Sequence, residues 1–387
     1  MLFVRLSMPK AGRFTSGFWK RAGISLISLA AAFLLAEWLF RQYGPKPYAP
    51  PEFRTTQGET TPLYEVIRTL RVSFEKSVAK QGFVERPRGL IVGEGKFLQW
   101  YDRPEWDYFE EDGTIEVEIN RLGFRDKDFE RKRGPDEYRV LSVGDSLTFG
   151  TGVPLEKVWP QILERRLQEL RETPVEVINA GLASGSHWPP GYYPWLETDG
   201  VLLEPDVVIL GICLNDMSDT VPMLAYRQPE FGSEEGNLQP WLGGVSHLLN
   251  HLQLTLAQRR ERQSPIDAVQ LVREDAASWN ECQESMRAMR DLLEERNIRF
   301  IVTVFPMFCL LGESYPYLGL HEMMAEFCRV EGVEHLDLLD RFRGMDEEDL
   351  WVHPTDQHPN HLGHEIMADG IFDYLEVNPE RRKKLPR

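Results

Sequence analysis

The chain has 387 residues, and its 61 acidic and 44 basic side chains give a formal net charge of −17. This acidic balance argues against a general nucleic-acid binder, which needs a stripe of basic residues to replace counterions. We therefore expect no nucleic-acid partner. Apolar residues make up 42% of the chain, which argues against disorder by composition, and four cysteines are too few for a disulfide-built scaffold.

The N-terminal segment combines a basic tail with an apolar stretch. Residues 1–21 contain five basic side chains and no acidic one, and residues 22–40 contain a single charge, Glu37. As a helix this stretch would be roughly 28 Å long, about the thickness of a bilayer's hydrocarbon core. We therefore predict a transmembrane anchor over residues 22–43 of a bacterial inner-membrane protein, with the basic tail cytoplasmic and the body extracytoplasmic. A cleaved signal peptide and a buried soluble helix are the alternatives.

Three further segments flank the body of the protein. Residues 44–89 begin as a proline-rich polar linker and continue into an amphipathic pattern over about residues 61–81 that predicts a helix. Residues 90–135 contain short alternating pieces such as GTIEVEIN, which predict a small β-containing lead-in. Residues 377–387 are a basic tail that we interpret as a solvated end.

Residues 136–376 alternate apolar runs with helical patterns and predict the main domain. The candidate strands are YRVLSVGDS, VEVINAG, DVVILGICLN, IRFIVTVFP and EHLDLLD. Continuous runs of this kind are typical of strands that are covered on both faces. The alternation predicts βαβ units with right-handed crossovers, and therefore an α/β fold with a central parallel sheet between helix layers. Residues 221–265 do not fit the alternation and are predicted to be an insertion.

Polar residues stand where the predicted strands end, which is where open parallel sheets bind their ligands. The first strand runs into GDSLTFG, which contains Ser146, the third ends at Asn215, and His358 precedes the last predicted helix. A serine hydroxyl is a poor nucleophile unless a base takes its proton, so His358 is the candidate base and Asp356 the candidate to orient its ring. An oxyanion would need the Ser146 N–H, a glycine N–H after the second strand and the Asn215 amide as donors.

In these blocks the sequence resembles the SGNH, or GDSL-type, hydrolases. The matching residues are GDS at 144–146, glycine after the second strand, N-D at 215–216 and H-P-N-x-x-G-H at 358–364. The resemblance covers roughly residues 135–376, and NRLGFRDKD at 120–128 is similar to the lead-in of membrane-anchored bacterial members.

The resemblance implies a flavodoxin-like three-layer α/β/α fold and a serine esterase or acyl hydrolase. Its substrate would be an ester-bearing small molecule, lipid or glycan, including an acetylated envelope glycan or lipid. We expect no cofactor. One alternative is an O-acyltransferase that uses the same residues on a cell-envelope polysaccharide. The other is a non-catalytic envelope protein that binds glycans.

Two positions depart from the family pattern. The family usually places its aspartate three residues before the histidine, but Thr355 stands there and the acid is Asp356, two residues before. Asp349 is a distant alternative acid.

The second departure concerns the oxyanion glycine. The family pattern places it about five residues after Asn179, where this chain has Ser184. Gly185 is one residue further on and is our candidate, with Gly181 as the alternative.

A dense group of histidines near the C-terminus resembles a set of zinc ligands. We interpret these side chains instead as the base and as packing or helix-capping residues, and expect no metal. The group comprises His353, Asp356, His358, His361 and His364.

Overall fold

The structure is a computed structural model, and it falls into two compact units. The smaller comprises residues 1–47 with 229–263, and the larger comprises residues 48–228 with 264–387. The residues that the structure describes are 16–44, 48–49, 51–61, 95–182, 188–217, 246, 248–249, 252, 268–312 and 315–376.

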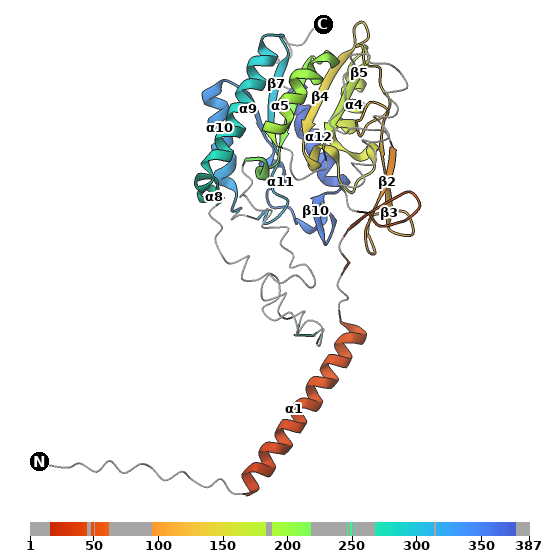
Figure 1. Cartoon of the computed structure of the whole chain (residues 1–387), viewed down its shortest axis with the longest axis vertical. Coiled ribbons are helices and arrows are strands. Elements are labelled where there is room, and N and C mark those ends of the chain that lie inside the picture. The colour runs from red at the N-terminus through yellow and green to blue at the C-terminus, as the bar shows by residue number, and fades with distance from the viewer. Residues whose placement is uncertain are drawn as a thin grey trace, which may run out of the picture. The chain divides into compact units, whose positions relative to one another are not determined.

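A five-stranded, fully parallel sheet forms the centre of the larger unit (Figure 1). All residues of its three inner strands are buried, as expected for a sheet that is covered on both faces. All five runs that the sequence predicted as strands form this sheet, so the predicted α/β class is confirmed. The strand order is β5 (Val175–Gly181), β4 (Tyr138–Gly144), β6 (Val207–Ile212), β7 (Arg299–Val304) and β8 (Glu334–Asp337).

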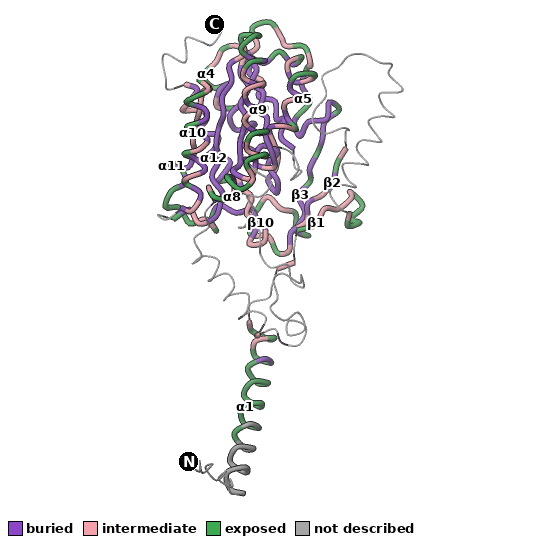
Figure 2. Tube along the Cα trace, turned by 60° about the vertical axis from the view of Figure 1, so that its left-hand side comes forward, coloured by how far each residue is buried: buried purple, intermediate pink, exposed green. Residues whose placement is uncertain are grey.

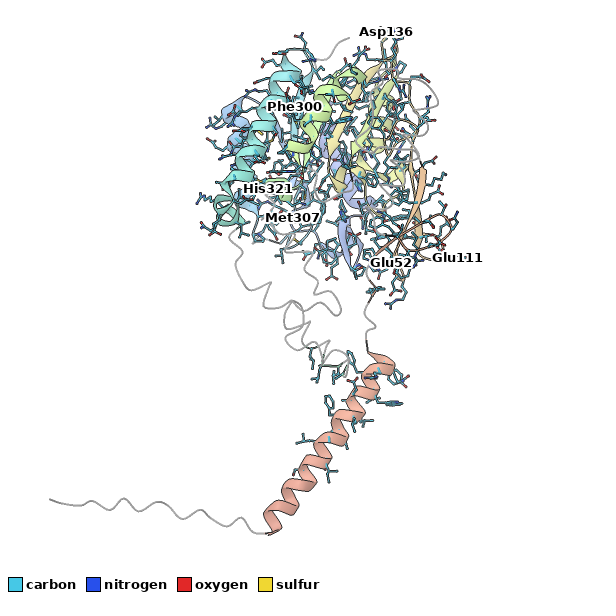
Figure 3. The ribbon with its side chains drawn as sticks, in the orientation of Figure 1. Glu52, Glu111, Asp136, Phe300, Met307 and His321 are labelled. Atoms are coloured by element: carbon cyan, nitrogen blue, oxygen red, sulfur yellow. The ribbon has the colours of Figure 1, made fainter. Side chains whose placement is uncertain are left out.

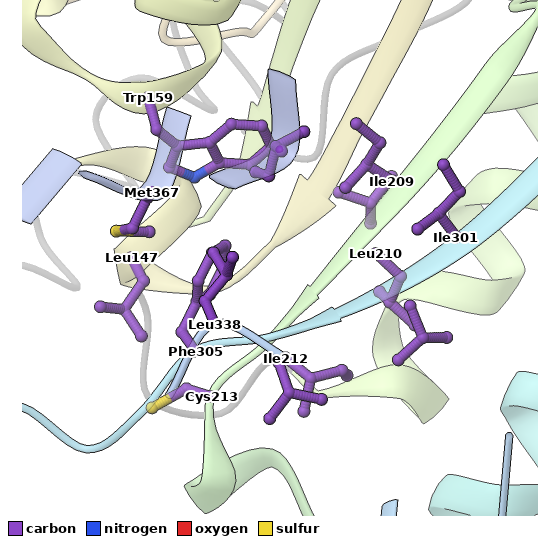
Figure 4. Packing of buried hydrophobic residues seen from close by; sticks show 14 of the residues in the cluster. Leu147, Trp159, Ile209, Leu210, Ile212, Cys213, Ile301, Phe305, Leu338 and Met367 are labelled. Atoms are coloured by element: carbon purple, nitrogen blue, oxygen red, sulfur yellow. The ribbon is translucent and has the colours of Figure 1, made fainter. Parts of the chain in front are cut away.

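Helices pack on the sheet and against one another, and Figure 2 shows the strands as buried between them. The pairs in contact are α4 with α12, α5 with α9, and α8 with α9 and α10. Trp159 of α4 and Met367 of α12 belong to one apolar cluster with Leu147 (Figure 4). The helices are α4 (Trp159–Leu170), α5 (Pro189–Thr198), α8 (Ala268–Glu274), α9 (Ala276–Glu294), α10 (Leu318–Glu331) and α12 (His361–Glu376).

Short elements complete the larger unit. Two strands, β9 (Trp351–His353) and β10 (Asp356–Pro359), form a separate antiparallel pair just before α12. The short helices and turns are α3 (Ser146–Phe149), α11 (Leu339–Phe342), η1 (Leu155–Lys157), η2 (Gly200–Leu203), η3 (Leu214–Met217) and η4 (Glu348–Leu350).

The direction of the strand order reverses at β4. The chain passes from β4 to β5 on one side and then returns to β6 on the other side of β4. Crossovers in opposite directions leave a crevice beyond the carboxyl ends of the two strands at this switch point. Ser146 directly follows β4 and Asn215 lies just after β6, so the topology brings both to this crevice.

A three-stranded antiparallel sheet precedes the parallel one. It consists of β1 (Glu52–Arg54), β2 (Gly95–Trp100) and β3 (Thr114–Ile119). The β2–β3 hairpin is the predicted small β element, whereas β1 forms within the predicted linker. Phe97 and Val117 pack with Phe149 of the main domain, so the hairpin shares a core with that domain. The predicted boundary at residues 135 and 136 therefore does not separate two packed bodies.

Helix α1 (Ser16–Tyr43) covers the predicted membrane anchor. Its single acidic residue, Glu37, is 8% exposed and accepts hydrogen bonds from Arg41 Nε (2.6 Å), Ser246 Oγ (2.7 Å) and Leu248 N (3.1 Å). Within the described part of the chain, no helix combines the length and apolar character that a membrane crossing requires. For residues 22–43 the structure therefore bears out the helix but not the membrane-spanning role.

Some predicted features lie wholly or largely outside the described residues. They are the basic tail at 1–21, the helical pattern at 61–81, the insertion at 221–265 and the tail at 377–387.

Candidate active site

The turn after β4 presents Ser146 at the start of a short helix. The Asp145 side chain caps that helix by accepting a hydrogen bond from Leu147 N at 3.0 Å. Gly144 leaves no space for a side chain, because an added Cβ would lie 2.3 Å from Thr148 Oγ1 and 2.8 Å from Gly211 O. The close packing forces the chain to turn sharply and leaves the Ser146 side chain half-buried at the crevice.

The structure brings Ser146, His358 and Asp356 into one hydrogen-bonded line. His358 Nε2 lies 2.9 Å from Ser146 Oγ, and His358 Nδ1 lies 2.5 Å from Asp356 Oδ1. An ionised carboxylate can only accept, so Nδ1 carries the proton in the neutral ring and Nε2 accepts from the serine hydroxyl. This is the arrangement that a serine nucleophile and its base require.

The short spacing between Asp356 and His358 does not prevent their contact. Both lie on β10, whose pairing with β9 shifts register between Asp356 and Pro359. Asp356 Oδ1 accepts from the main-chain N of His358 at 3.1 Å as well as from its ring. Asp349, the alternative acid, contributes its main-chain oxygen to Asn360 Nδ2 at 2.8 Å instead.

The charges around His358 favour its protonated form. Burial lowers the pKa of His358, but the charge of Asp356, its hydrogen bond and the charge of Asp145 outweigh burial and raise the pKa above 6.5. Burial raises the pKa of Asp356, yet the charge of His358 and hydrogen bonds from His358 and Tyr101 bring that pKa below 3.8. Asp356 is therefore ionised throughout the neutral range.

Asp145 is a second carboxyl group beside His358. Burial raises the pKa of Asp145 to about 6, against the lowering effects of the Leu147 N–H and the charge of His358. Asp216, in the turn after β6, is also buried, and burial followed by repulsion from Asp145 raises its pKa well above 3.8. Asp145 therefore becomes charged as the pH rises through about 6.

The candidate oxyanion donors differ in their positions and in the partners of their N–H groups. Ser146 is the first residue of α3, so its N–H has no partner within that helix. Asn215 lines the same cleft as Ser146 and His358. Gly185 lies outside the described residues. Gly181, its alternative, donates its N–H to Asn179 Oδ1 at 3.0 Å and packs under the backbone of α3, which is a structural role.

A small cleft opens beside Ser146. As bounded by the described residues, it has room of about 20 Å³, and its apolar lining comes from Leu147 and the segment Pro306–Cys309 after β7. Figure 3 places Met307 of this segment and Asp136, which precedes β4, toward opposite ends of the sheet, so the cleft lies at the carboxyl ends of the strands.

The other histidines of the C-terminal group make structural contacts. His353 bonds Thr355 Oγ1 and the carbonyl of Asp102, and the ring of His361 packs edge-on against Trp106. His364 is fully buried and accepts from Trp159 N at 3.3 Å, while burial lowers its pKa to about 3. No group of His, Cys, Asp or Glu among the described residues is arranged to hold a metal ion.

Comparison with known proteins agrees with this geometry. The family described as "GDSL-like Lipase/Acylhydrolase family" matches residues 142–366, more than half of the chain. The chain belongs to the GDSL-like lipase/acylhydrolase family. As a GDSL-like acylhydrolase, the protein is an enzyme that hydrolyses ester bonds.

Solved structures that resemble this acylhydrolase are distant from it. One is a G-D-S-L family lipolytic protein from Desulfitobacterium hafniense (18% identity, 60% of this chain and 97% of that one, TM-score 0.37). A two-domain esterase active on acetylated mannans has 14% identity over 66% of this chain and 52% of that one, with a TM-score of 0.40. An acetyl-xylooligosaccharide esterase from Geobacillus has 14% identity over 62% of this chain and 95% of that one, with a TM-score of 0.39. Likenesses this weak carry no argument about substrate. No curated protein matches the sequence.

Three residues before the matched segment of this GDSL-like enzyme reach its site. The Tyr101 hydroxyl donates to Asp356 Oδ2 at 2.8 Å. The buried Arg125 guanidinium donates to the carbonyls of Phe149, at 2.6 Å, and of Gly150 and Val153, and so holds the end of α3. The Asp126 carboxylate accepts from Asn179 N (2.8 Å) and Gln161 Nε2 (2.7 Å). Arg125 and Asp126 belong to the segment NRLGFRDKD, which resembles a lead-in of the family. The residues of that segment alone did not predict a function for it.

Proposed function

We propose that the protein is a serine ester hydrolase whose nucleophile is Ser146. The observation that supports this most directly is the pair of hydrogen bonds that joins Ser146 Oγ to His358 Nε2 and His358 Nδ1 to Asp356. His358 accepts the hydroxyl proton as Ser146 Oγ bonds to the acyl carbon, and Asp356 stabilises the resulting imidazolium.

The second half of the reaction uses the same groups. The imidazolium returns its proton to the leaving alcohol, and the tetrahedral intermediate collapses to an acyl-serine ester. His358 then takes a proton from water as the water oxygen adds to the acyl carbon, and the second tetrahedral intermediate expels Ser146 Oγ, which takes that proton back from His358 as the carboxylic acid forms. The Ser146 N–H, the Asn215 amide and, as predicted from the sequence, the Gly185 N–H stabilise the oxyanion in both halves.

We further propose that the acyl group is short. The cleft of about 20 Å³ beside Ser146 has room for roughly one water-sized group, and a methyl group is of this size. Leu147, Met307 and Phe308 supply apolar contacts that suit such a methyl. An acetyl ester therefore fits this space better than an ester of a longer acid.

Kinetics with p-nitrophenyl esters test the nucleophile and the acyl length together. We expect the full-length protein to hydrolyse the acetate faster than the octanoate, and S146A to lose at least about 10³-fold in kcat/KM. S142A is the matched control, because Ser142 is a buried serine of β4 whose hydroxyl makes no hydrogen bond among the described residues. Unchanged activity in S146A would refute the nucleophile, and a preference for octanoate would refute the short acyl group.

We also propose that α1 attaches the enzyme to a membrane. Its exposed apolar side chains support this. Exposure of such residues to water along one helix is costly unless a lipid or another apolar phase covers them. They are Ile27, Leu29, Phe33, Leu34, Leu35, Trp38 and Leu39. Recovery of the full chain in salt-washed membranes tests the attachment.

A further inference from the structure

Tyr101 reaches the catalytic acid from a part of the chain that the family match does not include. It directly follows β2, whereas the match begins at residue 142. Its side chain is 1% exposed and packs with Ile115, Val153 and Val352. The hydroxyl lies 2.8 Å from Asp356 Oδ2, and no space remains around it, because a Cβ added to Gly152 would lie 2.7 Å from this oxygen.

The two oxygens of Asp356 have separate partners. Oδ1 accepts from the ring and the main-chain N of His358, and Oδ2 accepts from Tyr101. Asp356 is 5% exposed, so water does not readily replace the phenol. The carboxylate would otherwise be free to rotate about its side-chain torsion and to turn Oδ1 away from the ring, because that torsion is soft. The Tyr101 hydroxyl fixes the rotation by holding the opposite oxygen.

We propose that Tyr101 is a positioning residue for the hydrolysis, which fixes the Asp356 carboxylate against His358 Nδ1 through its hydrogen bond to Oδ2. The inference rests on the proposed function of the three residues. It makes the β2–β3 hairpin a working part of the active site.

The same hydrogen bond affects the acid–base behaviour of His358. In Y101F the Asp356 carboxylate is no longer held against Nδ1, so its charge and its hydrogen bond stabilise the imidazolium less. The pKa of His358 then falls. The other titratable groups that act on this pair are Asp145 after β4, His353 on β9, His364 on α12 and Tyr108 after β2, and none of them changes in the variant.

The experiment compares Y101F with wild type in the full-length protein, using p-nitrophenyl acetate. We expect kcat to fall by about 10- to 100-fold with KM within about twofold, because the lost contact orients the base and does not bind substrate. We also expect the acid limb of the kcat/KM profile to move downward by about half a pH unit. Y108F is the matched control, since Tyr108 is half-buried nearby, its hydroxyl makes no hydrogen bond among the described residues, and burial raises its pKa and keeps it uncharged. It should leave both quantities unchanged.

Two results would overturn the inference. One is a Y101F enzyme with wild-type kcat and pH profile, and the other is an equal loss in Y108F, which would indicate a packing effect. NMR titration of the His358 ring in both proteins gives the shift without relying on turnover, so failure of the proposed hydrolysis is distinguishable from failure of the Tyr101 contact. If Y101F does not fold, a fluorotyrosine at position 101 must move the His358 titration, because it changes the strength of the hydrogen bond to Oδ2. An unmoved titration would refute the contact.

Discussion

His358 lies between two carboxyl groups that differ in their hydrogen bonds. Asp356 receives donors from His358 and Tyr101, and its pKa is lowered despite burial. Asp145 accepts from Leu147 N, and burial dominates, so its pKa rises to about 6. The first group is therefore a fixed negative charge at neutral pH, whereas the second becomes charged only as the pH rises through about 6.

This difference predicts the effect of D145N on the pH profile. The charge of Asp145 is one of the causes that raise the pKa of His358. Without that charge the neutral imidazole persists to lower pH, so the acid limb of kcat/KM moves downward, while the asparagine oxygen still caps α3. D349N, at an exposed aspartate, serves as control. An unmoved or upward-shifted limb in D145N would contradict this assignment of charges.

Some residues of the candidate site could be predicted from the sequence, and others could not. Ser146, Asn215 and His358 could be identified because each follows a strand end or precedes a helix within a short, dense motif. Asp356 could be identified because it is two residues from the base. Tyr101 could not, since it is 255 residues from Asp356 and meets it only after the hairpin packs on the main domain. No periodicity or motif marks a single tyrosine of this kind.

At the scale of elements, the nucleophile helix α3 rests on a close-packed support. Gly181 at the end of β5 lies under its backbone, where an added Cβ would be 2.1 Å from Phe149 N. Arg125 holds the carbonyls of Phe149 and Gly150 at the C-terminal end of the same helix. The four residues of α3 are too few to be stable alone, so their conformation depends on these neighbours.

We expect G181A to destabilise the protein and displace Ser146. Overpacking of this kind typically costs about 1–3 kcal/mol of unfolding free energy, and here the clash is with backbone that cannot rotate away. Denaturant unfolding and esterase kinetics of G181A would be compared with those of G312A, because nothing lies within 4 Å of a Cβ at Gly312. Equal stability and activity of the two variants would show that α3 does not depend on this support.

Elements were predictable where their pattern was long. The inner strands β4, β6 and β7 are largely apolar runs bounded by turn residues, and such runs are typical of strands covered on both faces. β1 is only three residues long and has no apolar period, so it was interpreted as linker. The close packing of the lead-in hairpin on the main domain was also missed, because its alternating pattern shows which face is buried but not what covers it.

At the scale of the whole molecule, the exposed large apolar side chains of the described residues are concentrated on α1. If α1 binds lipid, the full chain should sediment with membranes after a high-salt wash and be released by detergent. A variant with Leu29, Leu34 and Leu35 changed to Gln removes three exposed apolar side chains without touching the described contacts of Glu37. It should shift to the soluble fraction. Equal sedimentation of both proteins would contradict attachment through these side chains.

The central claim is that His358 activates Ser146 as a nucleophile. Reaction of the folded full-length protein with a fluorophosphonate, followed by peptide mass spectrometry, tests this most directly, because the phosphorus bonds to an activated serine oxygen without needing the true substrate. We predict one adduct at Ser146 and strong suppression of labelling in H358A. The labelling rate should fall at low pH with the same pKa as the acid limb of kcat/KM. A folded wild-type protein with no adduct at Ser146, or with equal labelling in H358A, would contradict it.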